Sequence, residues 1–352
     1  MNIKDNRFSR RDFLKHSAIS LAGLSLGAGR LQWAMGDDTK PPAFARSSVI
    51  AVKNTGIMQG GKPDSDAVRK MVDEGMFALT GKKTTADAWR TLFTPDDIVG
   101  IKVNPLGGPK LTTRPEVVES IIQGLRAAGV KDNNIIIWDR FSYHLIATYY
   151  PLNKGDTGVR CYGSEPTSGY DKDIYYESLD DDFSLRQDEG ARSLFSNIVT
   201  QHVTAIINVP VMKDHGIAGV TLCLKNLAFG AVNNTQRFHS PPYFYDPASA
   251  EICLHPAMRN KVRLHIVDAL QACFDGGPAS MKNWTMWNEE RLFFGTDPVA
   301  IDRIGLEIID KKRRENNYPS IIQKAKHIAT GEKLGLGIYD RNNIDFVEIN
   351  CL

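Results

Sequence analysis

The sequence contains no Cys-x-x-Cys motif, although it has five cysteines. Ferredoxin-type iron–sulfur clusters and covalently attached haem both need closely spaced cysteines, so neither cofactor is expected. Cys223 and Cys273 lie in apolar segments, where a reduced core position is the simplest interpretation. An odd number of cysteines leaves at least one thiol free. The spacing selects no disulfide pair.

Long blocks of basic residues and stripes of alternating basic and aromatic residues are also lacking. The chain has 43 Lys and Arg against 41 Asp and Glu, for a net charge of +2. Nucleic-acid-binding domains usually gather positive charge on one surface. No nucleic-acid partner is therefore expected.

The sequence has few long hydrophobic segments. Its N-terminal apolar segment, Ser17–Gly29, is short and rich in glycine and serine. Such a segment is too short to span a bilayer stably. It follows the pair Arg10 and Arg11 and precedes small residues at 34–36 that could be a cleavage site. The arginine pair resembles a twin-arginine export signal. An amphipathic N-terminal helix is the alternative.

This interpretation divides the chain into a twin-arginine signal peptide at 1–36, a linker at 37–46 and a single α/β domain at 47–352. We expect the twin-arginine machinery to export the protein to the periplasm, with no stable membrane span after processing. Residues 140–200 are rich in Tyr, Asp, Gly and Ser, with an acidic run at 180–182, and are expected to form an irregular excursion or lid over one edge.

Short apolar segments alternate with segments of helical periodicity through the rest of the domain. Strands are expected at 47–52, 97–103, 134–139, 203–209, 262–269, 291–297 and 344–349. Helices are expected at 65–79, after a capping box formed by Thr113 and Glu116, after Asp297, and at about 319–330. Continuous apolar strands joined by helices predict a mainly parallel, mixed sheet flanked by helices on both faces.

Charged and amide side chains follow several of these strands. Open parallel sheets bind ligands at the carboxyl ends of their strands, so we expect these residues to gather at one edge. They are Lys102, Asn104, Asp139, Arg140, Lys213, Asp214, His215, Asp268 and Asp297. Taken singly, each has a structural explanation: Asp297 is a good N-cap, Asp139 and Asp268 could cap loops, and His215 could be a hydrogen-bonded structural residue.

Lys225 is harder to explain structurally, because it lies in the apolar segment 221–229. A lysine on a buried helix face must be neutral, paired or turned toward a cleft. Three ammonium groups in one cleft, from Lys102, Lys213 and Lys225, would repel one another unless an anion or carboxylates balanced them. This pattern predicts a site for a small anionic ligand.

Four segments, DIVGIKVN, INVPVMKDHGIAGVTLCLKN, VDALQACFDGGP and GTDPVAID, occur in an order that resembles the family known as domain of unknown function 362 (DUF362). The resemblance extends over residues 47–310. Many members of that family carry an added ferredoxin-type module, whose cysteine runs this chain lacks. The resemblance marks Lys102, Asn104, Lys213, His215, Lys225, Asn226, Asp268, Asp297 and Asp302 as functional positions, and it implies no particular reaction.

Two classes of function remain open. In the first, the protein is an enzyme acting on a small anionic metabolite, with His215 as general base and Lys213 and Lys225 as electrostatic stabilisers. In the second, it is a non-catalytic periplasmic protein that binds or delivers a ligand or metal. A divalent metal held by His215 and two aspartates is possible, although no His-x-x-His or His-x-Glu motif supports it.

Overall fold

The computed structural model describes residues 46–177, 192–239, 244–278 and 285–351. The expected signal peptide, most of the linker and the acidic run at 180–182 lie outside these ranges. No helix within them is long and apolar enough to cross a membrane.

A large mixed sheet runs through the middle of the domain, with eleven strands in the described part of the chain. Its main path follows the order β15 (Ile344–Asn350), β1 (Ser47–Lys53), β14 (Arg291–Gly295), β12 (Val262–Asp275), β9 (Ala205–Asn208), β4 (Val99–Lys102), β5 (Ile135–Trp138) and β6 (Arg160–Cys161). Three more strands, β10 (Val211–His215), β11 (Gly219–Thr221) and β13 (Thr285–Trp287), extend the side next to β12.

Strands β12, β9, β4, β5 and β6 are mutually parallel. Their central members β9, β4 and β5 are buried at every position, as expected for parallel strands covered on both faces. Strand β14 is antiparallel to both β12 and β1, and β1 is parallel to β15. The predicted mainly parallel, mixed α/β fold is therefore confirmed.

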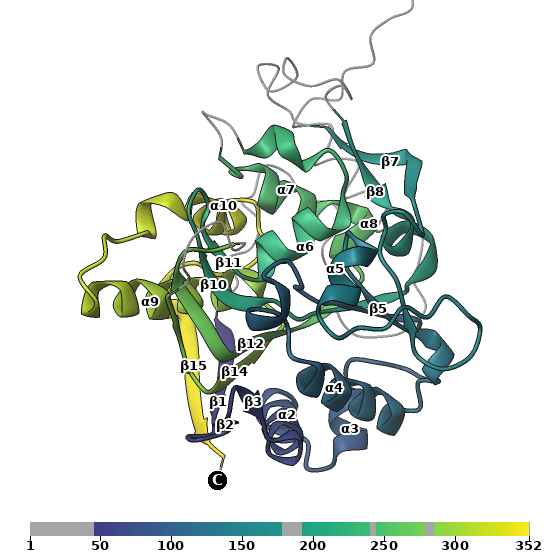
Figure 1. Ribbon diagram of the computed structural model, residues 1–352, viewed down its shortest axis with the longest axis horizontal. Coiled ribbons are helices and arrows are strands. Elements are labelled where there is room, and N and C mark those ends of the chain that lie inside the picture. The colour runs from purple at the N-terminus through teal and green to yellow at the C-terminus, as the bar shows by residue number, and fades with distance from the viewer. Residues whose placement is uncertain (1–45, 178–191, 240–243, 279–284, 352) are drawn as a thin grey trace, which may run out of the picture.

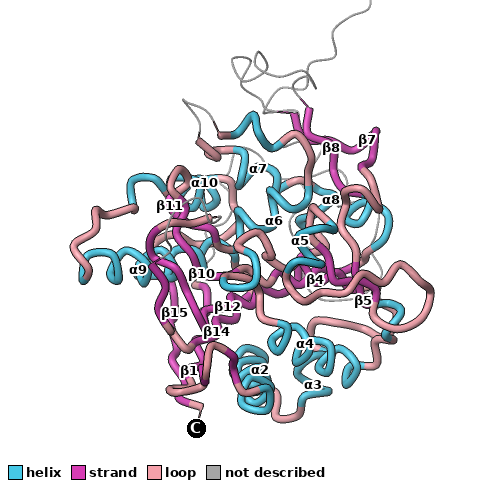
Figure 2. Tube along the Cα trace, in the orientation of Figure 1, coloured by secondary structure: helices cyan, strands magenta, loops and turns pink. Residues whose placement is uncertain are grey.

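Helices cover both faces of the sheet (Figure 1). On one face are α2 (Ser65–Thr80), α3 (Thr85–Arg90) and α4 (Pro115–Ala128), and on the other are α6 (Cys223–Ala231), α7 (Ala248–Leu254), α8 (Pro256–Arg259), α9 (Pro298–Glu315) and α10 (Lys326–Lys333). Figure 2 shows the strands as a layer between the two groups. Two large apolar clusters, one for each face, form the core.

Segment 140–200 contains regular structure of its own. It includes α5 (Ser142–Ala147), strand β6 at the sheet edge, and the antiparallel pair β7 (Tyr170–Glu177) and β8 (Arg192–Ser196). A further two-stranded pair, β2 (Met58–Gln59) and β3 (Lys62–Pro63), precedes α2.

The predicted capping box before α4 is wrong. Arg114 is the N-cap residue, and Pro115 begins the helix. Proline is favoured at the first helical position, because its missing N–H would have no helical partner there. The Thr113 hydroxyl instead donates to the Val209 carbonyl at 2.7 Å and accepts the Asn104 N–H at 2.8 Å.

Two predicted strand ends also differ. Strand β12 continues to Asp275, because its second half pairs with β10 and β13, so Asp268 lies within the strand. Strand β14 runs antiparallel to β12. The carboxyl end of β14, and Asp297 after it, therefore lie at the opposite edge of the sheet. Asp268 and Asp297 therefore do not extend from the same strand ends as Lys102 and Asp139.

Candidate functional site

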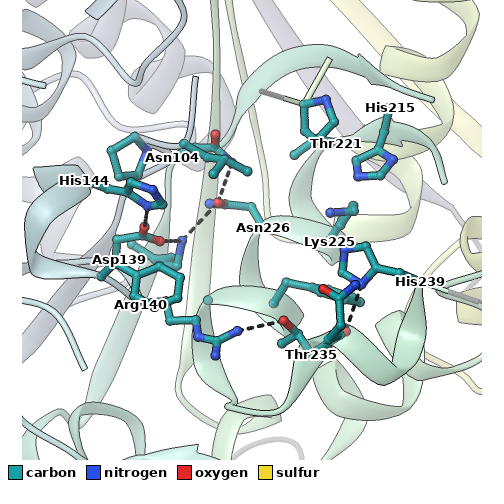
Figure 3. A pocket seen from close by; sticks show the side chains of 18 of the residues that line it. Asn104, Asp139, Arg140, His144, His215, Thr221, Lys225, Asn226, Thr235 and His239 are labelled. Atoms are coloured by element: carbon teal, nitrogen blue, oxygen red, sulfur yellow. Dashed lines mark hydrogen bonds and ion pairs between the residues drawn. The ribbon is translucent and has the colours of Figure 1, made fainter. Parts of the chain in front are cut away.

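A pocket of about 660 Å³ lies beyond the carboxyl ends of β4 and β5, between α5 and α6 (Figure 3). This is the edge at which parallel sheets usually bind ligands. Its polar lining comes from four parts of the chain: Lys102 at the end of β4 and Asn104 after it; Asp139, Arg140 and His144 after β5; His215 and Thr221 in β10 and β11; and Lys225, Asn226, Asn234, Thr235, Gln236 and His239 in and after α6. Several predicted residues thus line one cavity.

Lys102 forms a buried ion pair at the base of the pocket. Its ammonium is 2.6 Å from Asp139 Oδ1 and also donates to the Val103 carbonyl at 2.7 Å and to Asn226 Oδ1 at 3.0 Å. Burial is the largest single influence and raises the pKa of Asp139, but the Lys102 charge together with hydrogen bonds from His144, Lys102 and the Arg140 N–H outweighs it, and the pKa falls to about 2. All three ammonium protons of Lys102 therefore form hydrogen bonds with acceptors of the protein itself.

Glycine at position 230 lets Lys102 reach this position. A Cβ atom at Gly230 would lie 1.8 Å from the Cε atom of Lys102. Any side chain there would displace either helix α6 or the lysine. The close approach of α6 to the end of β4 therefore depends on this glycine.

Amide side chains join Lys102 to a second buried lysine. Asn104 Nδ2 donates to Asn226 Oδ1 at 2.8 Å, and Lys213 Nζ donates to Asn104 Oδ1 at 2.6 Å. Asn226 Nδ2 in turn donates to Asn208 Oδ1 at 2.8 Å. Lys213 is completely buried and does not line the pocket, and burial lowers its pKa to about 8. This network fixes the positions of β4, β10 and α6 relative to one another.

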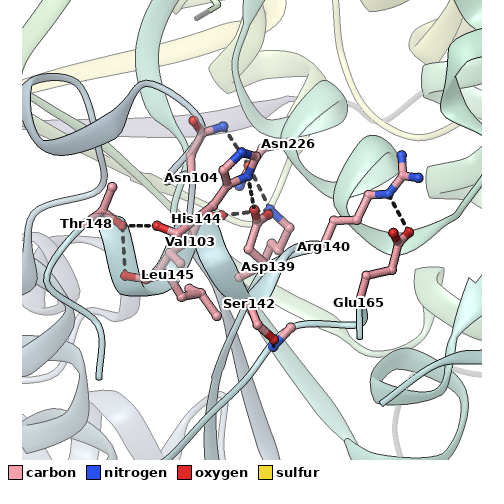
Figure 4. A network of polar contacts seen from close by, with 12 residues as sticks. Val103, Asn104, Asp139, Arg140, Ser142, His144, Leu145, Thr148, Glu165 and Asn226 are labelled. Atoms are coloured by element: carbon pink, nitrogen blue, oxygen red, sulfur yellow. Dashed lines mark hydrogen bonds and ion pairs between the residues drawn. The ribbon is translucent and has the colours of Figure 1, made fainter. Parts of the chain in front are cut away.

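Asp139 and Arg140 take part in the network of polar contacts drawn in Figure 4. Asp139 Oδ2 lies 3.8 Å from His144 Nδ1. Arg140 donates through Nε to Glu165 Oε1 at 3.1 Å and through Nη1 to Thr235 Oγ1 at 2.7 Å. Arg140 therefore connects the loop after β5 to the segment that follows α6.

Lys225 differs from the other two lysines. Within the described residues its ammonium has neither a hydrogen-bond acceptor nor a carboxylate partner, although the residue is only 7% exposed. Its Nζ atom lies 4.6 Å from the ring centroid of Phe229 and 4.6 Å from that of Tyr245. Burial, followed by repulsion from Lys213 and Lys102, lowers its pKa to about 7. The aromatic faces attract a cation and offset part of this effect.

Two histidines flank Lys225 in Figure 3. His215 Nδ1 accepts the backbone N–H groups of Ile217 and Ala218 at 3.2 and 3.1 Å, which places the ring proton on Nε2. Burial strongly lowers the pKa of His215, so the ring is neutral and suited to donate a hydrogen bond. His239 Nδ1 lies 3.0 Å from the Thr235 carbonyl and must donate to it, so the neutral ring carries its lone pair on Nε2, which has no hydrogen-bond partner among the described residues.

Three of the predicted carboxylates serve structural roles away from the pocket lining. Asp268 accepts the backbone N–H groups of Arg114 at 2.7 Å and Leu270 at 3.1 Å. Asp297 is the N-cap of α9, as its sequence context indicates. Asp302 accepts the N–H groups of Cys223 at 2.6 Å and Leu224 at 3.0 Å, and so holds the first turn of α6, the helix that carries Lys225 and Asn226.

Sequence reasoning did not select His144, His239 or Thr221 as candidates, although all three line the pocket. The hydroxyl oxygen of Thr221 is buried and has no hydrogen-bond partner in the described ranges. His239 follows α6 in a polar segment without periodicity, which gives no sequence signal. Across the ranges that the structure covers, no group of three or more His, Cys, Asp or Glu side chains is arranged to hold a metal ion.

The geometry defines an α/β protein with a positively charged pocket at the carboxyl ends of its parallel strands. Residues 99–307 match the family described as domain of unknown function (DUF362), and the chain therefore belongs to this family. No curated protein matches the sequence. The crystal structure of a Thermotoga maritima protein, a structural-genomics target, is similar with a TM-score of 0.41 and 8% identity over 78% of this chain and 60% of that one.

Proposed function

We propose that the pocket binds a small anionic metabolite and that the protein is an enzyme acting on it. The charge balance of the pocket carries this proposal. Its described lining contains three cationic side chains: Lys102, which Asp139 neutralises, Arg140, which is paired with Glu165, and Lys225, which has no carboxylate partner among the described residues. Like charges held at low exposure repel one another, so an anion would stabilise the pocket.

Lys225 and Thr221 are the groups best placed to contact this anion. Both are buried in the lining, and neither has a hydrogen-bond partner among the described residues. Buried polar groups normally have partners, and a bound ligand would supply them. The Nε2–H group of His215 would add a third donor on the same side of the pocket.

The acid–base role falls to His239 in this proposal. The lone pair on its Nε2 atom has no hydrogen-bond donor among the described residues, whereas the lone pair on His215 Nδ1 already accepts two backbone N–H groups. His215 therefore suits a hydrogen-bond donor better than the general base that the sequence suggests. A base with a free lone pair beside a cationic ligand site is the arrangement that proton-transfer chemistry requires.

The alternative is a non-catalytic periplasmic protein that carries a ligand or metal. A carrier would use the same cations without needing a base. Replacing His239 by Ala separates the two, because an enzyme would lose turnover and a carrier would keep its affinity for the ligand.

We also propose export by the twin-arginine route. The paired arginines, the short apolar segment and the small residues at 34–36 support a signal peptide of residues 1–36. The enzyme or carrier would then act in the periplasm.

Thermal unfolding in the presence of sulfate, phosphate and small carboxylates tests the anion site, and native mass spectrometry of the purified protein would reveal a retained ligand. A ligand at 100 times its dissociation constant adds about 2.7 kcal/mol to the unfolding free energy. We expect at least one anion to stabilise the wild type and Lys131→Met, which changes an exposed lysine, but not Lys225→Met. Equal stabilisation of all three proteins, or of none, would contradict the proposal.

A further inference from the structure

We infer that Lys225 is a nucleophile whose amine condenses with the carbonyl group of a small anionic oxo compound, such as a 2-oxo acid, to form an imine. This inference rests on the proposed anion site and names the class of compound that the site would take. It assigns Lys225 a covalent role in addition to its charge.

The contacts of the three lysines distinguish Lys225 from the others. Lys102 donates to a carboxylate, a carbonyl and an amide oxygen, and Lys213 donates to Asn104. These bonds use all three ammonium protons of Lys102, and Lys213 does not line the pocket. Lys225 lines the pocket without such an acceptor in the described part of the chain, so its nitrogen can reach a ligand.

The surroundings of Lys225 favour the free amine. The titratable groups that face it are Lys102, Lys213, His215, His239 and His327, together with the Tyr245 hydroxyl, whose own pKa is raised by burial. None of these groups supplies a negative charge near neutral pH. Burial is the largest influence and brings the pKa of Lys225 to about 7.

This environment raises the fraction of Lys225 in the nucleophilic free-amine form by orders of magnitude. Near pH 7 about half of the Lys225 side chains carry a lone pair, compared with roughly one in 10³ for a lysine of ordinary pKa. Desolvation beside an apolar surface and neighbouring cations is the usual way in which proteins activate a lysine toward carbonyl compounds. The Phe229 and Tyr245 rings provide that surface here.

The chemistry balances without an oxidant or reductant. The Lys225 nitrogen attacks the carbonyl carbon, a C–N bond forms, and the carbonyl π electrons move to oxygen. His239 Nε2 takes one proton from nitrogen and delivers it to the alkoxide oxygen, which accepts a hydrogen bond from His215 Nε2–H, and a carbinolamine results. His239 then carries the second nitrogen proton to the hydroxyl group, the C–O bond breaks, water leaves and the nitrogen lone pair forms the C=N bond. The carboxylate of the compound would face Arg140, which also lines the pocket.

Reductive trapping with glyoxylate and sodium cyanoborohydride tests this role. Reduction of the imine leaves a stable carboxymethyl group on the lysine, and peptide mass spectrometry locates it. At pH 7 we expect Lys225 to be labelled at least 10²-fold faster than the exposed Lys131, following the difference in free amine. Sulfate should slow labelling at Lys225 and leave Lys131 unaffected.

The pH dependence provides a second readout that a merely accessible lysine would not give. Labelling at Lys225 should rise up to about pH 7 and then level off, whereas labelling at Lys131 should continue to rise in alkaline solution. Lys225→Arg keeps a positive charge and should lose the fast phase, and Lys131→Arg should retain it.

Each result separates this inference from the proposed function. If sulfate stabilises the protein and Lys225 is labelled no faster than Lys131, the nucleophile is wrong and the anion site stands. If labelling is fast and none of sulfate, phosphate and small carboxylates affects either labelling or stability, the nucleophile is supported and the anion site is wrong. Absence of both effects would overturn both.

Discussion

Replacing Lys225 by Met should stabilise the folded protein at pH 6, whereas replacing Lys102 by Met should destabilise it. The two lysines are both largely buried and lie in the same pocket, but only Lys102 has a carboxylate partner in the described residues. Lys102→Met would leave Asp139 buried without its ammonium. Losing one member of a buried pair typically costs about 3–5 kcal/mol.

The expected stability change of Lys225→Met follows from the pKa of Lys225 in the folded protein. A fall from 10.5 to about 7 means that holding the charge in the folded state at pH 6 costs on the order of 3–5 kcal/mol. The two aromatic rings return about 1–2 kcal/mol of this through cation–π attraction. Methionine keeps favourable contacts with both rings, so we expect Lys225→Met to gain about 1–3 kcal/mol.

The sign of the pH dependence follows from the same pKa. Between pH 7 and 10 the unfolded chain binds the Lys225 proton and the folded chain does not, so wild-type stability should rise with pH in this range. Lys225→Met should show a smaller rise, since Lys213, with a pKa of about 8, still contributes. The advantage of the variant over the wild type should therefore shrink from pH 6 to pH 9.

Urea unfolding of the wild type and both variants at pH 6 and pH 9 measures these differences. A loss of 3 kcal/mol or more in Lys225→Met, similar to Lys102→Met, would refute the reasoning, because it would mean that Lys225 has a structural partner.

The sequence predicts the fold well because the central parallel strands are continuously apolar, and that pattern depends little on tertiary context. It also draws attention to Lys225, because a lysine within an apolar helix needs an explanation. The expected convergence of Asp268 and Asp297 fails for a topological reason. Strand direction and length depend on pairing partners, and neither the antiparallel β14 nor the extension of β12 to Asp275 is visible in local pattern.

His239, in contrast, could not be selected from the sequence. Its place in the pocket depends on the path of the chain after α6, and its free lone pair depends on a bond to a backbone carbonyl. Neither property has a sequence signature. The family resemblance, in contrast, identifies Asp302 as a functional position, and the structure gives it a physical role in holding the start of α6.

Three further predictions concern other parts of the molecule. Asp302→Ala leaves the buried N–H groups of Cys223 and Leu224 without their acceptor. It should lower the free energy of unfolding in urea by about 2–4 kcal/mol and weaken anion binding. Unchanged values for both would show that the start of α6 does not depend on this carboxylate. Replacing both Arg10 and Arg11 by Lys should leave the precursor in the cytoplasm, since the export receptor distinguishes guanidinium from ammonium, and normal periplasmic amounts in a fractionation would rule out the twin-arginine signal. Anaerobically purified protein should be colourless, because the sequence lacks closely spaced cysteines, and stoichiometric iron with acid-labile sulfide would disprove this.

The most direct test of the anion site is a crystal of the protein soaked in selenate, with data collected at the selenium absorption edge. We expect an anomalous peak in the pocket within hydrogen-bonding distance of Lys225 Nζ and Thr221 Oγ1. Crystals of the Lys225→Met variant should lack this peak. Selenate bound only at other surfaces of the wild type, with none in the pocket at high concentration, would contradict the account.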